Sequence, residues 1–128
     1  MKEIKVPKLN KFAKLCYAEA EDRGFHSGGK IIDPTSKEII AHVANLHSEI
    51  SELYESYRLN KLNEPCDKAE AMEKVGLPTL TCLEEETSDI LIRVCDLAGT
   101  LNIDLEYAVK AKLEYNRTRA YRHGNKLA

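Results

Sequence analysis

The sequence predicts an all-α fold in which four main helices pack as a bundle, and three observations support this. Apolar residues recur at steps of three and four over four long stretches, which is the spacing of one buried helix face. Helix-start signals stand before three of these stretches, at Thr35, Thr81 and Asp104. No stretch shows the sustained apolar–polar alternation typical of a half-buried strand. Helices with such faces bury them against one another, which predicts a four-helix bundle.

The composition limits the class of protein. A chain of 128 residues suits a single domain, spanning 1–128, with its own core. Its 31% charged and 43% apolar residues are typical of a soluble globular protein, and a net charge of −2 argues against nucleic acid as a partner. No apolar run approaches the ~20 residues that span a bilayer, and the N-terminus lacks an apolar signal core. We therefore expect a cytoplasmic protein with no membrane partner.

The first helix is expected over residues 7–23, ending at Gly24. The glycines and proline of the next segment, 24–34, predict a loop. The four cysteines have no C-x-x-C spacing, and Cys16 and Cys95 stand among apolar residues at helical spacing. We expect these two to be reduced, buried thiols rather than part of a disulfide framework or a zinc site.

The second helix is expected to start at Asp33-Pro34, where Thr35 and Glu38 form a capping box. Its apolar face comprises Ile39, Ile40, Val43, Leu46, Ile50, Leu53, Tyr54 and Tyr57. Helical geometry places a polar stripe beside that face: His42, Asn45, Glu49 and Glu52. The helix therefore carries an E-x-x-E pair at the border of its buried side.

Residues 58–80 are the least regular part of the chain, with a short helix expected around 67–75. Long connections inside a compact domain are often lids or binding segments. Lys61 and Lys68 are the basic candidates in this one, although a lysine in such a segment is more commonly plain surface.

The third main helix is expected over residues 83–98, capped by Thr81 and Glu84 and ending near Gly99. Its apolar face comprises Leu83, Thr87, Ile90, Leu91, Val94, Leu97 and Ala98. Beside it lies a charged stripe: Glu86, Asp89, Arg93 and Asp96. The first two form an E-x-x-D pair one turn apart, so their side chains point to the same place.

The last helix is expected to follow an N-cap at Asp104. Leu105, Ala108, Val109 and Leu113 mark its buried side. Lys112, Asn116 and Arg119 share another stripe of the same helix. The tail that follows is basic, and such tails are commonly solvated.

The two acidic pairs predict a metal site. Antiparallel helices can bring Glu49, Glu52, Glu86 and Asp89 together, and carboxylates this close repel one another unless they share a cation. Oxygen-only ligands suit Mg²⁺ or Mn²⁺, and Mg²⁺ is usually completed by substrate phosphates. The stripe of Lys112, Asn116 and Arg119 offers direct partners for phosphate oxygens. The expected reaction is metal-assisted attack of water on a phosphoanhydride.

Two other chemistries fit the sequence poorly. A di-iron centre in a helical bundle requires Glu-x-x-His pairs, and no histidine of this chain has a glutamate three residues before it. The glycine-rich loop of Walker-type phosphate sites is also absent.

The motifs resemble those of a known family. EISELYE, EETSDILIRVCDLAG, DLEYAVKAKLEYN and a terminal YRHGNK are similar to segments of the MazG-like all-α nucleoside triphosphate pyrophosphohydrolases, over residues 36–126. The resemblance implies that Glu49, Glu52, Glu86 and Asp89 bind magnesium and that Lys112 and Asn116 help to hold the substrate. It implies cleavage between the α and β phosphates, which releases a nucleoside monophosphate and pyrophosphate. It also implies a homodimer or homotetramer with the site near the subunit interface.

The sequence leaves other points open. The 33 residues between Glu52 and Glu86 form a longer connection than is usual in that family. The residues that would recognise the base are open, with candidates named from position only: Phe25, His26, His42 and Asn45. We expect an enzyme of nucleotide-pool housekeeping, and the alternative is a non-catalytic helical binding or regulatory module.

Overall fold

The computed structural model describes residues 2–26 and 33–128, and this part of the chain is all-α. Its helices are α1 (Leu9–Asp22), α2 (Lys37–Arg58), α3 (Ala69–Lys74), α4 (Cys82–Leu101), α5 (Leu105–Thr118) and α6 (Arg122–Asn125). The described backbone forms no strand, only an isolated antiparallel bridge between Pro65 and Thr81. None of the described helices combines the length and apolar character that a bilayer span requires. Of the predicted loop 24–34, residues 27–32 lie outside the described ranges.

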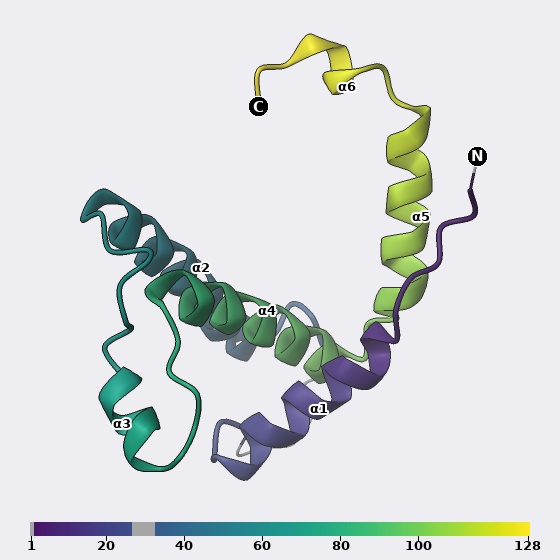
Figure 1. Cartoon of the computed structure of the whole chain (residues 1–128). Helices are drawn as coiled ribbons and strands as arrows, with labels where there is room; N and C mark the ends of the chain where they lie inside the picture. Colours follow the sequence, from purple (N-terminus) through teal and green to yellow (C-terminus); the bar gives the residue numbers. More distant parts are fainter. Residues whose placement is uncertain (1, 27–32) are drawn as a thin grey trace.

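Three helices form the body of the molecule. α2 and α4 run side by side in opposite directions, and α1 crosses the C-terminal half of α4 (Figure 1). Small residues make the core of that crossing, with Phe12 and Leu105 packed against it: Ala13, Cys16, Cys95 and Ala98. A Cβ on Gly99 would lie only 2.7 Å from the carbonyl oxygen of Ala13, so glycine permits this close approach of α1 and α4.

The caps follow the sequence with one exception. Thr81 and Glu84 form the expected capping box at the start of α4. At the start of α2, however, the cap is Ser36, whose hydroxyl accepts from the backbone N–H of Glu38 at 3.3 Å. The expected box at Thr35 is wrong because the Thr35 hydroxyl and amide both donate to the carboxylate of Asp33.

The end of α4 also differs from expectation. The helix continues past Gly99 to Leu101 and ends at Asn102, which has a left-handed backbone conformation. Gly99 serves close packing rather than helix termination, and the helix runs two residues past it. Asp104 caps α5 as expected and also accepts a hydrogen bond from Asn10 at 2.8 Å, which ties α5 to α1.

The connection between α2 and α4 is tied down by backbone hydrogen bonds. The amide of Cys66 donates to Leu80, and the amide of Cys82 donates to Glu64, each at 2.9 Å. The expected short helix is confirmed as α3, within the predicted range 67–75.

All four cysteines are free, as expected. Cys16 and Cys95 are buried where α1 meets α4. Burial is the main cause that raises the pKa of the Cys16 thiol to about 11.

The apolar faces of α4 and α5 are less buried than the sequence predicts. Leu83, Leu91 and Val94 are exposed, because α4 meets α1 and α2 through its small and charged residues instead. α5 rises away from the body (Figure 1) and has no buried residue, with Leu113 42% exposed. Within one chain, therefore, the expected buried side of α5 has little to pack against.

Candidate metal centre

Three glutamates from the two antiparallel helices meet at one point. α2 carries Glu49 and Glu52 one turn apart, and α4 carries Glu86 opposite them. One carboxylate oxygen from each lies within 4.8 Å of the others, a spacing that suits a shared cation. We call Glu49, Glu52 and Glu86 the carboxylate triad.

The triad is electrostatically unfavourable without a cation. Burial, followed by repulsion from Glu52 and Glu85, raises the pKa of Glu86 to about 7. A hydrogen bond shared with Glu49, and then burial, raise the pKa of Glu52. The Oε2 atom of Glu86 is buried and has no hydrogen-bond partner among the described residues. A buried carboxylate oxygen without a donor is costly, and a hard cation would satisfy it.

Asp89 lies beside the triad rather than within it. Its side chain lines the adjoining pocket, and burial followed by repulsion from Glu49 raises the pKa of its carboxyl group. The structure thus brings three of the four expected ligands into one group and places the fourth next to them.

Two cations contact the carboxylates around the triad. The Nε of Arg93 donates to Oε1 of Glu49 at 2.6 Å. The ammonium of Lys68 pairs with Glu85, a buried carboxylate next to the triad. The helical period placed Arg93 on the charged stripe of α4. Lys68 was one of two basic candidates in the connection, but its pairing with Glu85 was not predicted, because that pairing depends on how the 59–81 connection folds.

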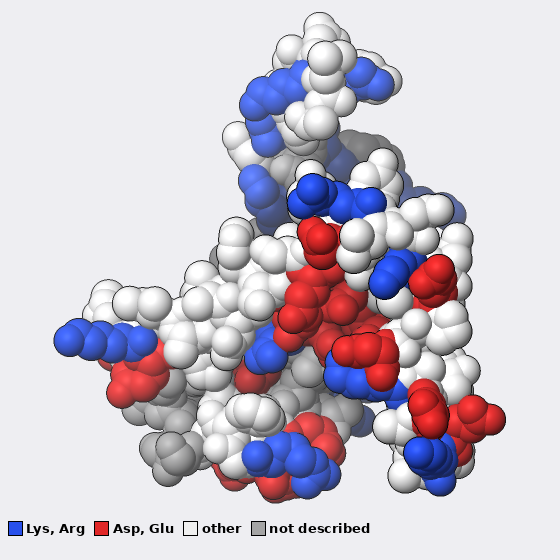
Figure 2. Space-filling model, turned by 90° about the vertical axis from the view of Figure 1, so that its left-hand side faces the viewer, with Lys and Arg blue, Asp and Glu red and all other residues white. Residues whose placement is uncertain are grey.

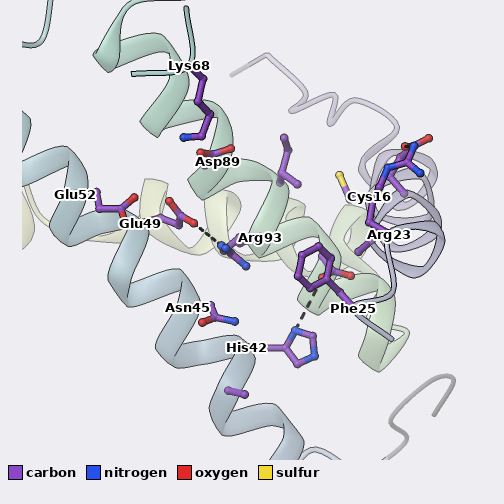
Figure 3. A pocket seen from close by; sticks show the side chains of 15 residues that line it. Cys16, Arg23, Phe25, His42, Asn45, Glu49, Glu52, Lys68, Asp89 and Arg93 are labelled. Atoms are coloured by element: carbon purple, nitrogen blue, oxygen red, sulfur yellow. Dashed lines mark hydrogen bonds and ion pairs between the residues drawn. The ribbon is translucent and has the colours of Figure 1, made fainter. Parts of the chain in front are cut away.

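A cavity of about 570 Å³ opens between α1, α2 and α4 (Figure 3). Glu49, Glu52 and Asp89 line one end. The other end is lined by Cys16, Arg23, Phe25, His42 and Asn45, and includes an aromatic ring that is 72% exposed. This volume lies within the range of small-molecule sites, and the two ends offer different chemistry.

His26 lies behind this cavity instead of lining it. It is only 8% exposed, its ring stacks on Tyr17, and its Nε2 lies 2.7 Å from Asp96. His42 stacks on the other side of His26 and also approaches Asp96, at 3.9 Å. Of these two predicted substrate contacts, Asn45 lines the cavity and His26 does not.

The predicted phosphate partners do not reach the triad within one chain. Lys112 lies on α5 and Arg119 caps its C-terminal end. Their cationic groups lie over the ring of Tyr115, at 4.8 and 6.0 Å from the ring centroid. The Oδ1 atom of Asn116 is buried and has no hydrogen-bond partner among the described residues. α5 rises away from α2 and α4 (Figure 1), and none of these three residues lines the cavity.

Comparison with known proteins adds no relative. A scan against protein-family models found no match, and searches of curated proteins and of solved structures found none either. The MazG-like resemblance therefore rests on the sequence motifs alone.

Proposed function

We propose that this chain is a magnesium-dependent nucleoside triphosphate pyrophosphohydrolase, which releases a nucleoside monophosphate and pyrophosphate. The observation that carries the proposal is the carboxylate triad, with the unpaired Glu86 oxygen, beside a cavity of nucleotide size. The sequence motifs support the same reaction.

The donor set fits Mg²⁺, with Mn²⁺ as a substitute. All three triad ligands are carboxylates on rigid helices, and hard divalent cations prefer such oxygens. When bound, the ion supplies Lewis-acid polarisation of the phosphoanhydride and of a water molecule. Its charge would also relieve the repulsion that raises the pKa of Glu86.

The neighbouring residues divide the remaining tasks. Arg93 fixes the orientation of the Glu49 carboxylate through its 2.6 Å hydrogen bond. Asp89, which faces the cavity next to the triad, is placed to accept a hydrogen bond from an attacking water. The function therefore assigns ligand roles to the triad and an orienting role to Asp89.

The other end of the cavity suits a nucleobase. The exposed ring of Phe25 offers a stacking surface, and the amide of Asn45 can both donate and accept hydrogen bonds. His26 supports this end from behind, because its bond to Asp96 anchors the segment that carries Phe25.

We further propose that a second copy of the chain completes the site, in a homodimer or in a homotetramer built from dimers. The exposed apolar residues of α2 and α4 include Ile50, Tyr54, Leu83 and Leu91, and α5 has no buried residue. Residues 2–14 and 104–128 carry eleven of the 19 lysines and arginines but only four of the 21 acidic residues. Figure 2 shows acidic side chains gathered over the body of the molecule. Basic side chains lie on the part that rises from the body, which comprises α5 and α6.

Docking of α5 onto a second copy joins these complementary surfaces. It would bury the apolar side of α5, complete a four-helix arrangement, and bring Lys112, Asn116 and Arg119 to the acidic end of the partner's cavity. Light scattering at micromolar concentration tests this step, since a monomeric mass would contradict it.

A pyrophosphate-release screen tests the function. Common and damaged nucleoside triphosphates are incubated with the protein and Mg²⁺, in parallel with the Glu86→Gln variant and with a chelator. We expect release with the wild-type protein alone. The absence of release from every substrate would favour the non-catalytic binding module, in which Arg93 merely neutralises Glu49.

A further inference from the structure

The connection between α2 and α4 brings a lysine to the acidic end of the cavity. Lys68 stands directly before α3 and lines the cavity together with Glu52 and Asp89. Figure 3 shows its side chain reaching toward the Asp89 carboxylate. The proposed function leaves both this residue and the long connection that carries it without a role.

The backbone around Lys68 is firmly held. Its neighbours Cys66 and Ala69 are buried, and the amide of Cys66 donates to Leu80. The amide of Ala69 donates in turn to the carbonyl of Cys66 at 3.1 Å. The position of the Lys68 Cα is therefore fixed relative to α4, and only the flexible side chain can adapt to a ligand.

The ammonium of Lys68, a residue that lines the cavity, is paired with two carboxylates. Its strongest contact is with Glu85, which is 7% exposed and therefore a poorly hydrated carboxylate. A second carboxylate, on the exposed Asp67, lies 3.3 Å away. An ammonium has three N–H donors, and these two partners take two of them. Because Lys68 lines the cavity, an anion bound there is within reach of the remaining donor.

We propose that Lys68 binds the pyrophosphate portion of the nucleoside triphosphate, with Glu85 as the residue that positions it. This inference rests on the proposed function and adds a substrate contact to it. Polyphosphate entering an end lined by Glu49, Glu52 and Asp89 needs positive charge beyond one divalent ion. Lys68 supplies that charge from the same chain, at the end of the cavity where the phosphates must lie.

Product inhibition tests the proposal. Inorganic pyrophosphate and nucleoside monophosphate are each measured as inhibitors of the wild-type enzyme, Lys68→Met and the control Lys74→Met, with saturating Mg²⁺. Lys74 lies on the same connection, and its ion pair with Glu70 is exposed. We expect Lys68→Met to weaken pyrophosphate inhibition by about tenfold to a hundredfold, the range for one lost hydrogen bond between charged groups. Monophosphate inhibition should be unchanged, and Lys74→Met should match the wild type.

A purely structural role for Lys68 predicts a different pattern. It would weaken inhibition by both products equally, or leave both unchanged with a lower melting temperature, and either result would overturn the proposal. Calorimetric titration of pyrophosphate with Mg²⁺ separates this proposal from the proposed function. If pyrophosphate binds in a Lys68-dependent way but no substrate is turned over, the Lys68 contact stands and the proposed enzymatic function is rejected. If pyrophosphate does not bind to the wild-type protein, both proposals are rejected.

Discussion

Removing one charge from the triad should stabilise the protein when no metal is bound. Glu86→Gln keeps the shape of the side chain and removes its charge. Because the pKa of Glu86 rises from 4.5 to about 7 on folding, its ionised form is disfavoured in the folded state. Below about pH 4.5 the group is protonated in both states and has no effect. Between about pH 4.5 and pH 7 the unfolded state releases the proton that the folded state keeps, so the fold loses stability progressively, and the full loss is present above about pH 7.

The shift sets the size of the effect. A change from 4.5 to about 7 corresponds to at most about 3 kcal/mol, and solvent in the adjoining cavity reduces the expected figure to roughly 1–3 kcal/mol. For a chain of this length that is a rise in melting temperature of at least about 3 °C.

Circular dichroism melts in a chelating buffer measure this effect at pH 5 and pH 8. Glu86→Gln should melt above the wild type at pH 8 and close to it at pH 5. Glu73→Gln, an exposed charge on α3, is the matched control. In a second series Mg²⁺ should stabilise the wild type more than the variant. Equal melting temperatures for wild type and Glu86→Gln at pH 8 would refute the description of a repulsive, cation-requiring triad.

Further substitutions test the site and the packing separately. Asp89→Asn should abolish turnover without lowering the melting temperature, because the carboxylate is placed to orient water; full activity would remove that role. Lys112→Ala and Asn116→Ala should each reduce kcat/KM by roughly tenfold to a hundredfold when Mg²⁺ is saturating. Wild-type values of kcat/KM in both variants would show that Lys112 and Asn116 do not contact the substrate. Gly99→Ala should destabilise the fold by about 1–3 kcal/mol in denaturant titrations, since its Cβ would lie 2.7 Å from the backbone oxygen of Ala13. An unchanged midpoint would show that α1 can move aside.

Helical periodicity predicted local features well. It located the main helices, the Thr81 and Glu84 cap and the acidic pairs on two different helices. These features depend on residues within one or two turns of each other, which the sequence shows directly. The free cysteines were likewise predictable from their spacing and apolar neighbours.

Placement across the fold was not predictable in the same way. Periodicity shows which residues share a helix face but not which neighbour that face meets. α4 turns its charged stripe and small residues inward, so Leu91 is exposed, and His26 is buried through its contact with Asp96, 70 positions away. The position of α5, which rises away from α2 and α4 (Figure 1), depends equally on packing between distant segments.

Phosphorus NMR of a complete reaction tests the central assignment most directly. The best substrate from the release screen is incubated with wild-type protein and Mg²⁺, and the products are identified by their resonances. If water breaks the bond between the α and β phosphates, the wild-type protein must produce equal amounts of nucleoside monophosphate and pyrophosphate. The Glu86→Gln variant should produce neither. Nucleoside diphosphate with orthophosphate, or unchanged triphosphate, would contradict the assignment.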